Sequence, residues 1–148
     1  MSGDSWATPQ WLFDYCNVKY GPFDVDVAAS EDNRKCEKFY TEKDNGLDIN
    51  NSWACKFWCN PPYSDPLPWV KRAAYQNGVM LLPADTSTFW FSFVFQDANE
   101  IVFINHRIKF EGATGSPKFG SILAVYDRDN KIRGVTKCSL VDLRRYIR

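Results

Sequence analysis

The sequence lacks several features that would place it in a membrane-spanning, secreted or disulfide-rich class. No apolar run approaches the ~20 residues of a membrane-spanning helix, and residues 1–4 have neither the basic stretch nor the apolar core of a signal peptide. The five cysteines are odd in number and irregularly spaced, which is not the pattern of a disulfide framework. We therefore expect a cytosolic chain with reduced thiols and no transmembrane segment.

Histidine is nearly absent, since His106 is the only one. Together with Cys36, Cys55 and Cys59 it offers four side chains of the types that bind zinc. A CxxxC spacing inside a strand, however, places both thiols on one face without a second pair. Core packing is the preferred interpretation of the cysteines, and no metal is expected. His106 has no evident nucleophile and base pair beside it, so we interpret it as structural.

The most informative stretch covers residues 54–69, ACKFWCNPPYSDPLPW. Residues 55–59 are rich in apolar and aromatic residues and form a stretch short enough for a buried strand, whereas two consecutive prolines cannot continue a strand ladder. The strand is therefore expected to end at Asn60. Ligands of an open α/β sheet sit at the carboxyl ends of its strands, so Asn60 and Tyr63 are predicted to lie at the mouth of a site.

The groups that follow this strand suit one kind of ligand. The side-chain oxygen of Asn60 and the backbone carbonyl of Pro61 are two acceptors, held by a backbone that the prolines fix. They match the two protons of an exocyclic NH2, and accepting both increases the electron density on a nitrogen that can attack an electrophilic methyl group. Tyr63 adds an aromatic face on which a planar base could stack. The stretch therefore predicts methylation of an amino group.

At these residues the chain resembles the phage-type DNA N6-adenine methyltransferases (Dam-like). The resemblance covers most of the chain. Its landmarks occur in order: WATP at residues 6–9, FDVDVAAS at 23–30, NPPY at 60–63, LLPADT at 81–86 and RIKF at 107–110. N4-cytosine and protein-glutamine methyltransferases have similar tetrapeptides, so the order of the landmarks adds weight that NPPY alone does not carry. The resemblance implies S-adenosylmethionine as cofactor, double-stranded DNA with a flipped adenine as substrate, and a phage or prophage origin in a bacterial host.

The order of elements predicts an α/β fold, a trimmed Rossmann-like S-adenosylmethionine-dependent methyltransferase sheet with helices on both faces. Strands are expected at residues 23–29, 55–59, 79–82, 100–104 and 122–126, the last two as an antiparallel pair. The polar interval 31–50 is predicted to be a short strand or a turn-rich crossing. The 148 residues fit one methyltransferase domain, 1–148, without a separate target-recognition domain.

Four helices are expected around these strands. The first has Thr8 as N-cap and Pro9 at the first helical position. The second follows Ser64 or Asp65 and ends near residue 77. The third, at residues 89–96, is aromatic and mostly buried. The fourth, at residues 139–147, is expected to turn Leu140, Leu143 and Ile147 inward and Arg144, Arg145 and Arg148 outward.

The resemblance assigns cofactor contacts to the first third of the chain. Thr8 and Pro9 belong to the opening segment, which in the family lies over the methionine part of S-adenosylmethionine. Asp26 lies toward the carboxyl end of the first predicted strand, and Ala28 lies where the chain turns out of it into the predicted cofactor loop, where larger methyltransferases have glycines. Asp44 precedes an Asn-Gly turn and is expected near the adenosyl moiety; the alternative is that it only caps that turn.

The net charge is zero at pH 7, yet the charges are unevenly distributed. Residues 1–50 hold five Lys/Arg and ten Asp/Glu, whereas residues 101–148 hold ten and four. An acidic first third suits a cationic sulfonium cofactor and a basic last third suits phosphates, although solvated faces explain any single charge equally well. A Gly/Ser/Thr/Pro loop flanked by Arg107, Lys109 and Lys118 is predicted to face DNA, with a plain hairpin as the alternative.

The sequence thus predicts a DNA adenine-N6 methyltransferase without a metal or a covalent intermediate. Asn60 and the Pro61 carbonyl would polarise the amino group. Pro62 would shape the turn, and Tyr63 would stack on the extruded base. Two alternatives stay open: methylation of cytosine N4 or of a protein glutamine, and a non-catalytic DNA-binding relative. A monomer and a dimer on a palindromic site are both compatible with the sequence, as are roles in phage self-protection and in restriction-modification.

Overall fold

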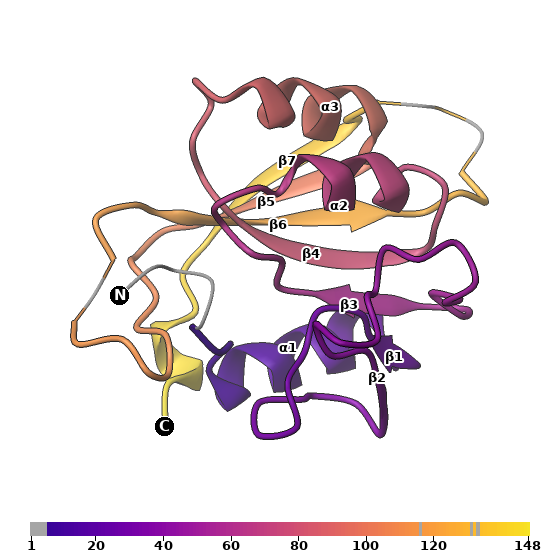
Figure 1. Cartoon of the computed structure of the whole chain (residues 1–148). Coiled ribbons are helices and arrows are strands. Elements are labelled where there is room, and N and C mark those ends of the chain that lie inside the picture. Colours follow the sequence, from indigo (N-terminus) through magenta and orange to yellow (C-terminus); the bar gives the residue numbers. More distant parts are fainter. Residues whose placement is uncertain (1–5, 116, 131, 133) are drawn as a thin grey trace.

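A computed structural model describes residues 6–115, 117–130, 132 and 134–148. Its centre is one mixed sheet of seven strands in the order β2-β1-β3-β4-β6-β5-β7 (Figure 1). The strands are β1 (Val25–Asp26), β2 (Lys38–Phe39), β3 (Phe57–Cys59), β4 (Gly78–Pro83), β5 (Glu100–Ile104), β6 (Ser121–Tyr126) and β7 (Lys137–Val141). The helices are α1 (Gln10–Tyr20), α2 (Leu67–Ala73), α3 (Phe89–Asp97) and a short 3-10 helix at Arg144–Tyr146.

The two halves of the sheet differ in strand direction. Strands β2, β1, β3 and β4 run parallel, with Val25 of β1 opposite Lys38 of β2 and Phe57 of β3. Strand β6 runs antiparallel to both β4 and β5, which confirms the antiparallel pair expected from the sequence. The chain places β2 on one side of β1 and β3 on the other, so the strand order reverses between β1 and β3. Such a reversal opens a crevice at the carboxyl ends of the two strands.

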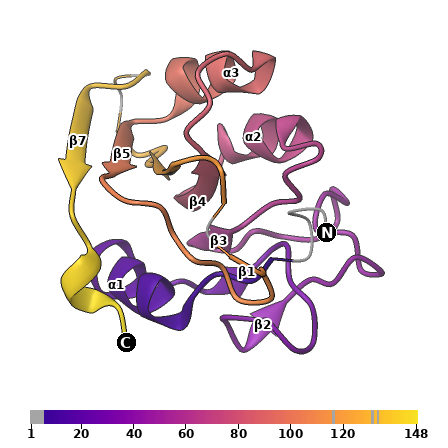
Figure 2. The same cartoon turned by 90° about the vertical axis from the view of Figure 1, so that its left-hand side faces the viewer.

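Helices cover both faces of the sheet, as predicted (Figure 1). Helix α1 packs on one face, and α2 and α3 pack on the other, which Figure 2 shows from the side. The residues of β4 alternate between the two cores, with Val79 and Leu81 toward α1 and Met80 and Leu82 toward α2 and α3. Burial on both faces explains the near-continuous apolar sequence of this strand. Within the described ranges, no helix has the length and apolar character needed to cross a membrane.

The interval between β1 and β3 is a turn-rich crossing with one short strand, β2, as the sequence predicts. Its second part folds back on itself around the buried Trp53, whose indole nitrogen donates to the carbonyl of Gly46 at 2.8 Å. The strand predicted at residues 55–59 begins only at Phe57. The reason is local, because Ala54 has a positive φ of 53° and Cys55 is exposed.

Two helix starts differ from the predicted ones. The N-cap of α1 is Pro9, and no side chain of the described residues caps the helix, so the prediction of Thr8 as N-cap is wrong. Helix α1 begins later than predicted because Ala7, the residue before Thr8, pairs with Glu111 in an antiparallel bridge that keeps the backbone extended. The N-cap of α2 is Pro66 rather than Ser64 or Asp65.

The C-terminal residues form an edge strand instead of the predicted helix. Strand β7 pairs in parallel with β5, and hydrogen bonding along this edge satisfies backbone groups that a surface helix would leave unpaired in β5. Leu140 is 66% exposed and Ile147 is 49% exposed, so their predicted inward positions are wrong, whereas Leu143 is buried. The prediction that α3 is mostly buried is also wrong, since Phe89 and Phe95 point to solvent.

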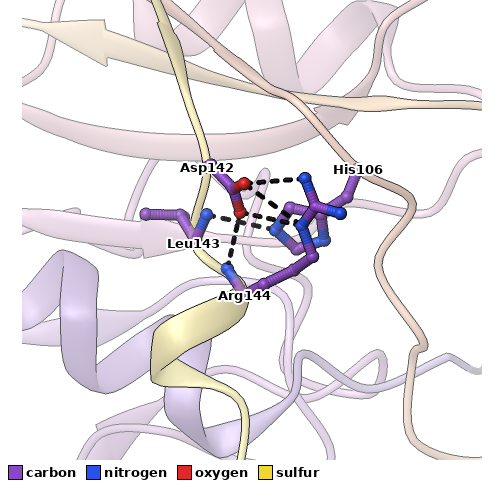
Figure 3. A network of polar contacts seen from close by, with 4 residues as sticks. All are labelled: His106, Asp142, Leu143 and Arg144. Atoms are coloured by element: carbon purple, nitrogen blue, oxygen red, sulfur yellow. Dashed lines mark hydrogen bonds and ion pairs between the residues drawn. The ribbon is translucent and has the colours of Figure 1, made fainter.

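The last turn is anchored to the segment after β5 (Figure 3). The backbone nitrogen of Leu143 donates to Nε2 of His106 at 3.2 Å, and the His106 ring stacks on Trp11 with centroids 6.3 Å apart. Arg144 donates to both carboxylate oxygens of Asp142, and these hydrogen bonds lower the pKa of Asp142 to about 2. His106 therefore has a structural role, as its sequence context indicates.

Candidate active site

A cleft of about 1000 Å³ lies at the carboxyl ends of β1, β2 and β3, beside the reversal of strand order. Its walls are formed by the loop after β1, the loop after β2 and the NPPY turn after β3, together with Trp69 of α2. The lining includes Ala28, Ala29, Ser30 and Glu31 from the first segment, Tyr40, Thr41, Glu42 and Lys43 from the second, and Asn60, Pro62 and Ser64 from the third. This is the position at which open α/β sheets bind their ligands.

The Asn60 side chain is oriented by the N-terminal segment. Its amide nitrogen donates to the backbone carbonyl of Trp6 at 3.3 Å. Because the nitrogen end of the amide faces Trp6, the oxygen end is the acceptor left for a ligand. The three residues of β3 before it are all buried, which gives Asn60 a rigid support. Pro61 is buried and Pro62 lines the cleft, so the backbone that carries the Pro61 carbonyl is fixed as well.

Trp6 is held in place by aromatic and backbone contacts. Its ring stacks on Phe110 and Phe119, with centroids 5.6 and 6.2 Å apart. The next residue, Ala7, exchanges two backbone hydrogen bonds of 3.0 Å with Glu111. The N-terminal segment and the loop between β5 and β6 therefore fix each other next to the NPPY turn.

Tyr63 is anchored beside the cleft and is not part of the lining that the described residues form. Its ring makes edge contacts with Phe110 and Phe119 at centroid distances of 6.1 and 5.8 Å. Its hydroxyl donates to the carbonyl of Leu81 at 3.2 Å, and burial raises the pKa of this hydroxyl well above the usual value. The stacking role predicted for Tyr63 stays a prediction.

Asp26 holds the loop after β1 and does not itself line the cleft. Its carboxylate accepts hydrogen bonds from the backbone nitrogens of Lys35, at 3.0 Å, and Ala28, at 3.4 Å. The side chain is buried, and this burial raises the pKa of Asp26 to about 6, against the two hydrogen bonds, which lower it. Ala28 lines the cleft, so Asp26 shapes the wall to which Ala28 belongs. Direct cofactor contacts of both residues stay predictions.

The other predicted cofactor residues, Asp44, Thr8 and Pro9, lie outside the cleft lining in the described part of the chain. The exposed Asp44 accepts from the backbone nitrogen and the hydroxyl of Thr41, at 2.9 and 3.0 Å, and these bonds lower its pKa. These hydrogen bonds close the turn at residues 41–44, which precedes the Asn-Gly turn that the alternative named. Thr8 and Pro9 are buried immediately before α1. Their contacts with a cofactor remain predictions.

The predicted DNA-facing residues Arg107, Lys109 and Lys118 are all exposed on the loop between β5 and β6. Arg107 donates to the carbonyl of Pro117 at 3.1 Å and so ties the two arms of the loop together. Residue 116 of this loop lies outside the described residues. Phe110 and Phe119 of the same loop pack against Tyr63, so this loop lies against the NPPY turn.

Metal-binding clusters are not found among the described residues, where no three His, Cys, Asp or Glu side chains gather to hold an ion. All five cysteines are free thiols. Cys59 is buried in β3 and Cys55 is exposed before it, so the expectation that both lie on one face of a strand is wrong. The strand starts too late to include Cys55.

The family model for DNA N-6-adenine-methyltransferase (Dam) matches residues 1–147 of the chain. The chain belongs to the Dam family. It is 46% identical over 109 residues to the DNA N-6-adenine-methyltransferase of Escherichia phage T1, a match that covers 68% of this chain and 44% of the phage protein. It is 44% identical over 116 residues to the DNA N-6-adenine-methyltransferase of Haemophilus phage HP1 (strain HP1c1), which covers 72% and 66%. The chain thus spans less than two thirds of the length of either relative, and no solved structure matches it.

One wall of the cleft in this Dam-family chain was not predicted. Tyr40, Thr41, Glu42 and Lys43 line the cleft directly after β2. The strand itself has two residues, Lys38–Phe39, which is too short to stand out as an alternating pattern. The position of these residues could nevertheless have been predicted from the order of the strands, because residues that follow neighbouring parallel strands meet at the same edge of a sheet.

Proposed function

We propose that this Dam-family chain transfers the methyl group of S-adenosylmethionine to N6 of adenine in DNA. The observation that carries the proposal is the position of Asn60. Asn60 follows a buried strand and lines the cleft beside the reversal of strand order. Its side chain is oriented by Trp6, which leaves the amide oxygen as an acceptor. Both phage relatives are named DNA N-6-adenine-methyltransferases, which supports adenine in DNA as the substrate.

The cleft fits S-adenosylmethionine as the methyl donor. A volume of about 1000 Å³ is at the upper end of the range of small-molecule sites and leaves room for a base beside the cofactor. Glu31 and Glu42 bring negative charge to a wall that would face a sulfonium cation, and Tyr40 and Trp69 bring aromatic surface for an adenine ring. When bound, S-adenosylmethionine supplies an electrophilic methyl carbon on a positively charged sulfur.

The chain contributes acceptors and geometry to the transfer. The Asn60 oxygen and the Pro61 carbonyl accept hydrogen bonds from the two N–H groups of the amino group and increase the electron density on N6. N6 would form a bond to the methyl carbon that S-adenosylmethionine supplies, with S-adenosylhomocysteine as the leaving group, and would then lose one proton to solvent. Pro62 keeps the turn rigid, so that these acceptors need no reorganisation during the reaction.

The target adenine is flipped out of double-stranded DNA in this mechanism, because the reacting nitrogen is inaccessible inside the duplex. Extrusion costs a few kcal/mol, which stacking on Tyr63 and the hydrogen bonds at Asn60 offset. Arg107, Lys109 and Lys118 would contact phosphates around the flipped base. Phage relatives further support an origin in a phage or prophage and action in the cytoplasm of the bacterial host.

Radiolabelled S-adenosylmethionine and adenine-unmethylated DNA test the proposal, with the DNA digested to nucleosides afterwards. The wild-type protein should label N6-methyldeoxyadenosine, and Asn60→Ala should lower the rate about a hundredfold, as for the loss of one preorganised polar group. Label in N4-methylcytosine or in protein would favour the alternative substrates. DNA binding without label and without cofactor binding would identify a non-catalytic relative.

A further inference from the structure

Arg72 of α2 holds the loop after β2, one wall of the cleft, from outside. Arg72 of α2 donates through Nη1 to the carbonyls of Gly46, at 3.1 Å, and Asp48, at 2.8 Å. Its Nη2 donates to the carbonyl of Asn51. The guanidinium also lies over the ring of Trp53, 4.9 Å from its centroid. One side chain thus engages three backbone carbonyls of the same loop.

Gly46 is the point at which this loop is pressed against the sheet. Its carbonyl accepts a second hydrogen bond, from the Trp53 indole nitrogen at 2.8 Å. A Cβ atom at Gly46 would lie 2.0 Å from the carbonyl oxygen of Val27 and 3.1 Å from the ring of Trp69. The loop therefore touches the end of β1 on one side and α2 on the other, with no room for a side chain between them.

The clamped loop forms part of the cleft, whereas Arg72 does not line it. Gly46 and Asn45 belong to the lining, as does Trp69, which precedes Arg72 by one helical turn and so shares its face of α2. Asn51 extends the clamp, because its side-chain nitrogen donates to the carbonyl of Asn45 at 2.9 Å. A shift of the loop away from Arg72 would move lining residues directly.

We propose that Arg72 is a positioning residue of the cofactor site, which fixes the loop after β2 against β1 and so preforms the cleft before a ligand enters. The inference rests on the proposed function, because it takes the cleft to be the cofactor site. A planar guanidinium presents its donors as a rigid fork that reaches carbonyls on two sides, which the single point of a lysine ammonium cannot do. A preformed loop avoids the loss of conformational freedom that binding would otherwise require.

Three variants of the full chain test this inference: Arg72→Met, Arg72→Lys and Lys71→Met. Lys71 is the matched control, because it is an exposed cation on the same helix whose ammonium lies 5.1 Å from the centroid of the Phe93 ring, away from the clamped loop. Calorimetry with S-adenosylhomocysteine measures cofactor-site affinity without turnover. Steady-state kinetics separate KM for the cofactor from kcat, and amide hydrogen exchange without ligand reports on the loop itself.

Arg72→Met should weaken S-adenosylhomocysteine binding by about tenfold or more, as expected when hydrogen bonds from a charged donor are lost. KM for S-adenosylmethionine should rise in parallel, whereas kcat at saturating cofactor and the affinity for DNA should stay near the wild-type values. Arg72→Lys should restore part of the affinity. Amides of residues 44–51 should exchange faster in Arg72→Met and at the wild-type rate in Lys71→Met.

Unchanged S-adenosylhomocysteine affinity in folded Arg72→Met would overturn the inference, and so would an equal loss of affinity in Lys71→Met. If Arg72→Met does not fold, Arg72→Lys alone tests the inference. Lysine keeps the positive charge and most of the aliphatic side chain but lacks the planar guanidinium with its several donors. A wild-type protein that binds no S-adenosylhomocysteine would instead contradict the proposed function. In that case the exchange rates of residues 44–51 still show whether Arg72 holds the loop.

Discussion

The side-chain nitrogen of Asn60 lies 3.3 Å from the backbone oxygen of Trp6, although 54 positions of sequence separate the two residues. This hydrogen bond decides which end of the Asn60 amide faces the cleft. It depends in turn on Phe110 and Phe119, on which the Trp6 ring stacks. The acceptor geometry proposed for methyl transfer is therefore built from three segments that are distant in the sequence.

Asn60→Asp separates the acceptor role of this side chain from its anchoring by Trp6. The carboxylate keeps an acceptor for the amino group but has no donor for the Trp6 carbonyl, so it should turn away from its native orientation. We expect a kcat about tenfold below wild type and above that of Asn60→Ala. A tenfold decrease corresponds to the free energy of about one hydrogen bond to a charged group. Single-turnover rates on unmethylated DNA at saturating cofactor give the comparison. Equal rates for the Asp and Ala variants would show that an acceptor at this position is not sufficient.

The ring and the hydroxyl of Tyr63 should have different roles. Tyr63→Phe removes the hydrogen bond to the Leu81 carbonyl and should lower the free energy of unfolding by about 1 kcal/mol, with turnover unchanged. Tyr63→Ala also removes the platform for the flipped base and should lower kcat/KM for DNA by about tenfold or more. Chemical denaturation and methylation assays on both variants test this pair of expectations. A Phe variant as slow as the Ala variant would move the role from the ring to the hydroxyl.

The buried carboxylate of Asp26 should make stability depend on pH. Its pKa is about 6 in the folded chain against an ordinary value of 3.8, so between these values the folded state binds more protons than the unfolded state. The free energy of unfolding should therefore fall as pH rises from about 4 to 6, by up to about 3 kcal/mol from this group, and then stay level. Below pH 4 the carboxyl is protonated in both states and contributes no slope.

Asp26→Asn isolates that contribution, because it removes the titration and leaves every other ionisable group in place. Urea unfolding of both proteins at several pH values between 4 and 7 gives the free energy of unfolding as a function of pH. This free energy should fall with rising pH in the wild-type protein relative to the variant. Curves that run parallel would mean that the pKa of Asp26 is not raised in the folded chain.

The basic loop between β5 and β6 should contribute to DNA affinity through its charges. Lys109→Gln should reduce the magnitude of the slope of log Kobs against log salt concentration by about 0.9. This is the change expected from the counterion release that accompanies one phosphate contact. Lys137→Gln provides the control, since Lys137 is an exposed cation on the edge strand β7. Titrations of fluorescent duplex DNA at several salt concentrations measure both slopes. A change of similar size in the two variants would rule out a specific contribution of Lys109.

The sequence alone determined where the candidate site lies in the fold, at the end of β3, because that position depends on local steric rules. Two prolines cannot continue a strand ladder, so β3 had to stop before Pro61 and place Asn60 at its carboxyl end. The long apolar run of β4 likewise predicted a strand buried on both faces. The ordered landmarks around NPPY predicted the family, which the match over residues 1–147 confirms.

The tertiary structure decided what depends on partners distant in the chain. Leu140, Leu143 and Ile147 have a helical spacing, yet β7 forms because β5 offers an unpaired edge, and backbone pairing outweighs a local pattern. The orientation of the Asn60 amide and the clamp of Arg72 on the loop after β2 depend on hydrogen bonds to backbone carbonyls. Every residue carries such a carbonyl, so no residue type in the sequence marks the partner, and only the folded chain selects it.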